Sequence, residues 1–122
     1  ANMLGKKISE HRSKVYLINT GWVGGPYGVG RRMNLQHTRS MVKAALNGEL
    51  EKVIYRKHEI FNVEIPTSCP GVPDAILDPI NTWSDKRKYL ESAKRLASLF
   101  VRNFQKFENV PDDIVKSGPK TQ

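Results

Sequence analysis

The stretch GWVGGPYGVGRRMNLQHT, which runs from Gly21 to Thr38, decides how this chain is interpreted. Five of the nine glycines in the sequence, together with Pro26, lie between Gly21 and Gly30. Glycine tolerates positive φ and lets another part of the molecule approach the backbone closely, so this density predicts a loop rather than a regular element. Two arginines, a methionine and then a helical pattern follow the loop.

Glycine content alone does not identify a phosphate-binding loop. The stretch lacks the GxxxxGKS or GxxxxGKT ending that grips nucleotide phosphates. It follows an apolar run, but it contains no GxGxxG that opens a helix, so the dinucleotide fingerprint is missing as well. The glycines therefore leave phosphate binding open.

The segments on either side of the loop carry short helical and strand patterns. Apolar residues at near-helical spacing predict a helix over residues 1–12, and the apolar run 15–19 is typical of a strand. A second amphipathic helix is predicted over residues 38–46, where Asn47 and Gly48 provide a good C-terminal signal. This helix places Thr38 near its N-terminus.

The middle of the chain predicts a hairpin followed by a rigid connection. Residues 53–55 and 60–65 read as two short strands, the second with alternating apolar residues. Four prolines between Pro66 and Pro79 predict an extended, rigid loop with one short turn at residues 74–77.

The longest predicted element is a helix that Ser84 and Asp85 cap and that runs to about Phe107. Its apolar residues form one stripe, so the helix is expected to pack on a core: Tyr89, Ala93, Leu96, Ala97, Phe100, Phe104 and Phe107. Trp83 is expected to bury its ring at the base of this helix. The polar tail from Pro111 onward is expected to be loose.

Composition places the chain in the soluble globular class. Of its 122 residues, 39% are hydrophobic and 26% are charged. No apolar run approaches the roughly 20 residues that span a bilayer, which argues against a membrane protein. Cys69 is the only cysteine, so it forms no internal disulfide, and a reducing, cytoplasmic setting is the simplest expectation.

The charged and nucleophilic residues predict no catalytic or metal centre in this chain. The three histidines, His11, His37 and His58, share no ligand spacing, and Cys69 has no evident base near it in sequence. The net charge of +8 is compatible with nucleic acid, other anionic partners or simple solubility, because charge alone does not choose among them.

Three strings in the chain together resemble the C-terminal region of ATP-dependent phosphoenolpyruvate carboxykinases. They are VYLINTGWVGGPYGVGRRMNLQHTRSMVKAAL, IPTSCPGVP and ILDPINTW, followed by the long helical pattern. The resemblance covers roughly Ala1 to Phe107, in the family's order. It implies an α/β fold: part of the C-terminal, P-loop-containing nucleotide-binding domain, with a mixed sheet and packed helices, incomplete as a domain. Residues 1–107 would belong to that domain, and residues 108–122 would form a polar C-terminal tail.

The resemblance assigns nucleotide binding to Arg32, Met33 and Thr38. The family's motif has NTGW, a glycine-rich turn, a lysine-arginine pair and a threonine six residues after the arginine. A planar guanidinium can stack on a purine, a thioether can pack against the ring, and a hydroxyl can bond a ring nitrogen or ribose. The structural alternatives are a surface ion pair for Arg32, a core position for Met33 and a helix cap for Thr38.

Two positions and one short insertion depart from the usual family pattern. Arg31 stands where the family usually has lysine, and Met33 stands where a branched aliphatic residue is common. Arg31 keeps the positive charge of the lysine, and Met33 keeps the apolar bulk of the aliphatic residue. The segment GGPY, Gly24 to Tyr27, is present in one branch of the family and absent from another.

The resemblance implies the activity of a parent enzyme larger than this chain. That enzyme converts oxaloacetate and ATP to phosphoenolpyruvate, carbon dioxide and ADP in gluconeogenesis, with Mg²⁺ on the nucleotide and Mn²⁺ at the substrate. Its P-loop and metal ligands lie upstream of the matched region. The chain is therefore expected to be inactive alone and to need the remaining N-terminal part of the enzyme. The alternative is a free-standing basic module that binds nucleic acid or another anion.

Overall fold

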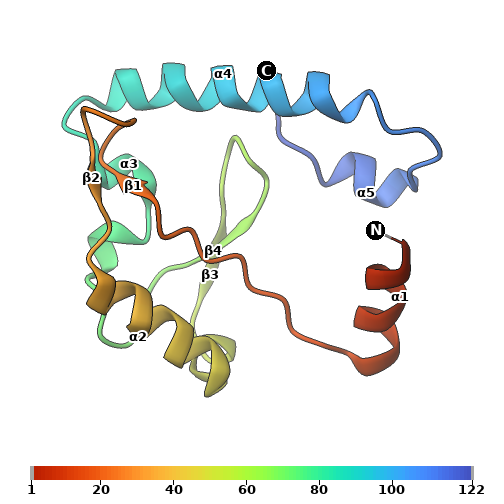
Figure 1. Ribbon diagram of the computed structural model, residues 1–122, viewed down its shortest axis with the longest axis horizontal. Coiled ribbons are helices and arrows are strands. Elements are labelled where there is room, and N and C mark those ends of the chain that lie inside the picture. Colours follow the sequence, from red (N-terminus) through yellow and green to blue (C-terminus); the bar gives the residue numbers. More distant parts are fainter. Residues whose placement is uncertain (1, 122) are drawn as a thin grey trace.

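The computed structural model describes residues 2–121. Helix α4 runs along one edge of the molecule and α2 lies at the opposite edge, with the hairpin of β3 and β4 between them (Figure 1). Helix α1 stands at the side away from β1 and β2, at the end of a long extended segment (Figure 1). The fold is a mixed α/β arrangement of helices and small sheets.

Helix α1, Asn2–His11, confirms the predicted N-terminal helix, although none of its residues is buried. The strand predicted at residues 15–19 is not formed, because this extended segment has no ladder partner within residues 2–121. A strand needs a neighbour for its backbone N–H and C=O groups, and the apolar pattern cannot supply one.

The glycine-rich stretch forms a small hairpin. Strand β1, Trp22–Val23, pairs antiparallel with β2, Arg31–Arg32, in the register Trp22 to Arg32 and Val23 to Arg31. The loop between them confirms the predicted irregular backbone, but its two ends are paired, which glycine content did not reveal.

Helix α2, Leu35–Leu46, begins three residues before the predicted start because Asn34 is its N-cap. The Asn34 side chain accepts a hydrogen bond from the backbone N–H of Gln36 at 2.9 Å. The helix ends at Asn47 as predicted, and Gly48 follows with a φ of 70°. A 3₁₀ turn, η1 (Glu49–Glu51), then places Leu50 in the core.

The predicted hairpin in the middle of the chain is confirmed with shifted ends. Strand β3, Tyr55–Lys57, pairs antiparallel with β4, Glu64–Pro66. The predicted short turn in the proline-rich connection is the 3₁₀ helix η2, Asp74–Ile76. A short helix, α3 (Pro79–Thr82), was not predicted: Pro79 occupies its first turn and the Asp78 side chain caps it.

Helix α4, Lys86–Phe104, confirms the longest predicted element and ends three residues early. The Asp85 carboxylate accepts hydrogen bonds from the backbone N–H groups of Arg87 at 2.9 Å and Lys88 at 3.1 Å. Only part of the predicted apolar stripe is buried, namely Tyr89, Ala93 and Ala97. Trp83 is half-buried and packs edge-to-face on Tyr89 with ring centroids 5.7 Å apart.

The C-terminal tail is not loose, contrary to expectation. It forms helix α5, Asp112–Lys116, and the backbone N–H of Lys120 donates to the carbonyl of Ile60 at 2.7 Å. The Asn62 side chain donates to the carbonyls of Lys116 and Ser117. The polar side chains of the tail did not predict these contacts, because the tail makes them with its backbone groups.

The expected mixed sheet is replaced, within residues 2–121, by two separate antiparallel pairs of two and three residues. Each strand pairs with its nearest neighbour in sequence, and no crossover brings a parallel strand beside it. The buried residues likewise form two clusters rather than one core. The first contains Ala44, Leu50, Cys69 and Val72, and the second contains Ile60, Tyr89, Ala93 and Ala97.

In the described part of the chain, no helix is long and apolar enough to cross a membrane.

Candidate nucleotide-binding site

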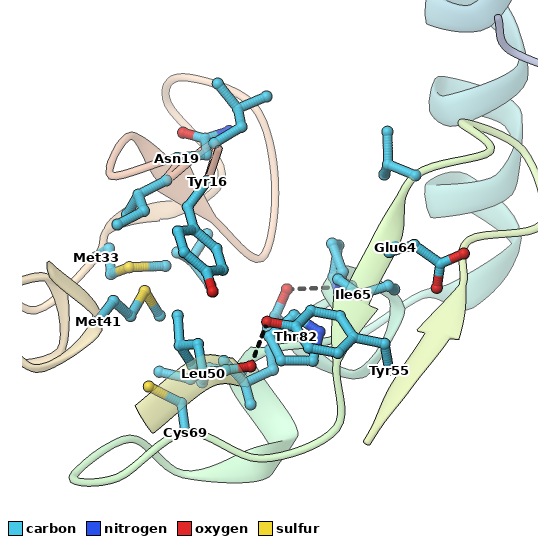
Figure 2. A pocket seen from close by; sticks show the side chains of 18 of the residues that line it. Tyr16, Asn19, Met33, Met41, Leu50, Tyr55, Glu64, Ile65, Cys69 and Thr82 are labelled. Atoms are coloured by element: carbon cyan, nitrogen blue, oxygen red, sulfur yellow. Dashed lines mark hydrogen bonds between the residues drawn. The ribbon is translucent and has the colours of Figure 1, made fainter. Parts of the chain in front are cut away.

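A cavity of about 890 Å³ lies where the glycine-rich hairpin meets the rest of the fold. The extended segment 14–19 and β1 line one part of it, and α2, β4 and α3 contribute side chains to the rest. Figure 2 shows Tyr16, Met33 and Met41 gathered on one side of this cavity and Glu64 on the other. The lining is mostly apolar, as in many small-molecule sites.

Met33 is the predicted nucleotide-binding residue that lines the cavity. It follows directly after β2, and its backbone N–H donates to the carbonyl of Gly21 at 3.0 Å, which extends the hairpin by one bond. Its side chain is half-buried beside that of Met41 from α2 (Figure 2). Two flexible thioethers can adapt to the outline of a planar ring.

Arg32 is exposed and does not itself line the cavity. It lies directly opposite Trp22 in the hairpin, and its Cζ atom is 5.8 Å from the centroid of the Trp22 ring. This distance is within the range of a cation–π contact. Trp22 does line the cavity, so Arg32 contacts a lining residue without lining the cavity itself.

Thr38 lies in the first turn of α2, where its backbone N–H donates to the carbonyl of Asn34 at 3.2 Å. It is half-buried and does not line the cavity. Asn34, not Thr38, caps the helix, so the cap alternative for Thr38 is wrong. The structure thus brings Arg32 and Met33 together at the hairpin and leaves Thr38 one turn into the helix.

Gly24 confirms the predicted need for close approach in the glycine-rich loop. Its φ is 81°, and a Cβ atom at this position would lie 2.8 Å from the carbonyl oxygen of Thr82. The loop therefore rests directly on the end of α3, which only glycine permits. This contact joins β1 to the segment that leads into α4.

Two polar groups of the cavity, the Tyr55 hydroxyl and the Cys69 thiol, are poorly suited to acid–base chemistry. The Tyr55 hydroxyl donates to the carbonyl of Leu50 at 2.9 Å (Figure 2). Burial, followed by the neighbouring Tyr16, raises the pKa of Tyr55 above its ordinary value. Burial, followed by the charge of Glu49, also raises the pKa of the Cys69 thiol, so this cysteine is not an activated nucleophile.

The described residues do not fit a metal site. Between residues 2 and 121 no group of three or more His, Cys, Asp or Glu side chains is placed to hold an ion. Divalent metals that activate nucleotides need such oxygen-rich or imidazole donor sets.

The assignment of site residues did not include Trp22, although it lies in the string that carries the resemblance. The signal that could have found it is the spacing of a short hairpin around the glycine-rich loop, because that spacing places Trp22 opposite Arg32. Tyr16 and Met41 were also missed as lining residues, because they belong to segments that only the tertiary fold brings to the hairpin.

The described residues define a small α/β unit whose glycine-rich hairpin borders an apolar cavity. A sequence model of the family "Phosphoenolpyruvate carboxykinase" matches residues 1–75. The chain belongs to the phosphoenolpyruvate carboxykinase family.

Curated relatives support this membership along nearly the whole chain. A phosphoenolpyruvate carboxykinase (ATP) of Caldanaerobacter subterraneus is 58% identical over 98% of this chain, and one of Fusobacterium nucleatum is 54% identical over 98%. One of Brevibacillus brevis is 58% identical over 100% of the chain. The chain spans only 23% of the length of each of these relatives. These matches give no support to the alternative of a free-standing basic module.

Proposed function

We propose that this chain is one section of an ATP-dependent phosphoenolpyruvate carboxykinase and that it supplies the adenine-side wall of the ATP site. The parent enzyme would convert oxaloacetate and ATP to phosphoenolpyruvate, carbon dioxide and ADP. The observation that carries the proposal is a 58% identical match that extends over 98% of this chain but only 23% of the relative. The cavity that Met33 lines, together with Trp22 that Arg32 faces, supports the assignment of the adenine side to this section.

The three proposed nucleotide contacts have distinct physical roles. Arg32 would stack one face of its guanidinium on the purine, and Met33 would pack against the ring from the cavity side. Thr38 would offer its hydroxyl, which has no hydrogen bond to another side chain or backbone group within residues 2–121. Because Thr38 does not line the cavity within residues 2–121, its contact with the nucleotide would depend on how the ligand extends toward α2.

Phosphate transfer would depend on residues outside this chain. The sequence contains no GxxxxGKS or GxxxxGKT string, and the described residues offer no metal ligand cluster. We therefore propose that Mg²⁺ and Mn²⁺ are held by the remaining N-terminal part of the enzyme and that this chain is inactive without it. In that setting residues 1–107 complete a P-loop-containing nucleotide-binding domain and residues 108–122 form its C-terminal tail. We place the enzyme in the cytoplasm, where the lone Cys69 stays reduced.

The proposed site is tested by titrating the full-length enzyme with ADP and comparing Arg32→Ala with the unchanged protein. Loss of a stacked guanidinium removes roughly 1 to 2 kcal/mol, so affinity should fall about 5- to 30-fold. Arg95→Ala is the matched control, because Arg95 is an exposed arginine on α4 away from the cavity. Equal affinities for Arg32→Ala and Arg95→Ala would show that the adenine site is elsewhere.

A further inference from the structure

Trp22 and Arg32 form a cross-strand pair whose geometry is set by the hairpin register. They lie directly opposite each other in the antiparallel pairing of β1 and β2. Residues opposite each other in such a pair project to the same face, with Cβ atoms about 5 Å apart. The 5.8 Å separation between Arg32 Cζ and the Trp22 ring centroid follows from this register.

Tyr27 supports the other side of this arrangement. Its ring meets that of Trp22 edge-on, with centroids 5.1 Å apart and an interplanar angle of 89°. The turn that carries Tyr27 is held by the Pro26 carbonyl, which accepts from the N–H groups of Val29 at 3.0 Å and Gly30 at 2.8 Å. Edge-to-face contact is a favoured geometry for aromatic pairs. The GGPY segment thus packs the Tyr27 ring against Trp22 and supports it.

Core packing within residues 2–121 does not account for this cluster. Tyr27 is 83% exposed and Trp22 is 40% exposed, and neither belongs to the two buried clusters. The contact between the two rings is local to the hairpin, and it fixes the ring that Arg32 faces.

A guanidinium that lies against an indole on one side keeps its other side available to a ligand. Arg32 is exposed, so a planar ring can reach that side from solvent. The indole limits the rotamers that the long arginine side chain samples, and a ligand that binds Arg32 then loses less side-chain entropy.

We propose that Trp22, buttressed by Tyr27, is a positioning residue that holds Arg32 in the orientation that stacks on a purine. The proposal rests on the proposed adenine site. It assigns to the GGPY segment a role in tuning nucleotide affinity rather than in the chemistry.

The test measures ADP affinity of the full-length enzyme by calorimetry for Trp22→Leu, Trp22→Phe, Arg32→Ala and the double variant Trp22→Leu with Arg32→Ala. Loss of an exposed cation–π contact should weaken ADP binding about 2- to 5-fold in Trp22→Leu. Trp22→Phe keeps an aromatic face and should recover most of this loss. In the Arg32→Ala background, Trp22→Leu should have no further effect, because its action passes through Arg32.

A second variant covers the case in which Trp22→Leu does not fold. Tyr27→Leu changes an exposed side chain and should weaken ADP binding about twofold, again only when Arg32 is present. The thermal unfolding midpoint of each variant checks that the fold is kept.

The outcomes separate this proposal from the one on which it rests. If Arg32→Ala binds ADP as tightly as the unchanged enzyme, the adenine site is wrong and the positioning role is wrong with it. If Arg32→Ala weakens binding but the aromatic variants do not, or if their effects add to that of Arg32→Ala, the positioning role alone is overturned.

Discussion

At the scale of single residues, His58 shows how one buried ring joins two distant parts of the chain. It is 8% exposed, and its Nδ1 atom accepts from the backbone N–H groups of Ile60 and Phe61, both at 3.2 Å. Nδ1 must therefore be unprotonated, and Nε2–H donates to the Tyr89 hydroxyl of α4 at 2.8 Å. The neutral tautomer of His58 ties the β3–β4 hairpin to α4.

Burial lowers the pKa of His58 below its ordinary value of 6.5. Among the charged groups that face the ring, Asp78 raises this pKa, Arg56 lowers it and Glu59 raises it, all by less than burial does. The unfolded chain therefore takes up a proton at His58 at a higher pH than the folded chain does.

We expect His58 to make stability depend on pH in a defined direction. The contribution of neutral His58 to the free energy of unfolding is complete above about pH 6.5. It is lost as pH falls from there toward the lower pKa of the folded state, by up to about 1.4 kcal/mol per pH unit. Urea unfolding between pH 8 and 5.5 measures this. His58→Asn keeps an acceptor near the Nδ1 position but does not titrate, so the stability advantage of the unchanged protein should shrink as pH falls. A constant difference across this range would contradict the assignment.

At the scale of elements, the glycine-rich hairpin depends on α3 for its position. Gly24 has a φ of 81° and packs against the Thr82 carbonyl, whereas Gly28 has a φ of 84° with no atom within 4 Å of a Cβ built there. Gly28 therefore needs glycine only for its positive φ, whereas Gly24 needs it both for its positive φ and for the close approach of α3.

Alanine substitutions should reveal this difference. Gly28→Ala should cost about 1 to 2 kcal/mol for the left-handed backbone alone. Gly24→Ala should cost more and should also weaken ADP binding, because the Thr82 carbonyl must move away from β1 and displace the hairpin that carries Arg32. Gly5→Ala in α1 is the control and should be neutral or slightly stabilising. Equal losses for Gly24→Ala and Gly28→Ala in chemical denaturation would show that the contact with α3 is unimportant.

At the scale of the whole molecule, the chain has the surface of an incomplete unit. The outer part of the α4 stripe is exposed, including Leu96, Phe100 and Phe104. In the extended segment, Tyr16 and Ile18 are half-buried while Leu17 is 96% exposed, which is the alternation of a strand with apolar side chains on both faces. We infer that residues 15–19 pair with a strand from the rest of the enzyme.

Amide hydrogen exchange tests this inference. In the 122-residue chain by itself, the amides of residues 15–19 should exchange rapidly, because they have no ladder partner within residues 2–121. In the full-length enzyme the same amides should be protected by orders of magnitude. The paired strand β3 is the internal control and should be protected in both proteins. Rapid exchange of residues 15–19 in the full-length enzyme would contradict the inferred pairing.

Local signals predicted the elements whose causes are local. The Asp85 cap, the helical stripe of α4, the stop at Asn47 and the prolines before η2 each act within a few residues, so their elements appear where expected. The tail was misjudged because its contacts with Ile60 and Asn62 cross more than fifty positions of sequence.

The amino-acid sequence by itself determined the family, the helices α1, α2 and α4, an irregular glycine-rich loop and the choice of Arg32, Met33 and Thr38 as site candidates. Only the tertiary structure decided that Met33 lines a cavity, that Arg32 lies against Trp22 and that Thr38 sits apart from both. The physical reason is that motifs record which side chains are available, whereas strand register and the packing of distant segments decide which of them meet.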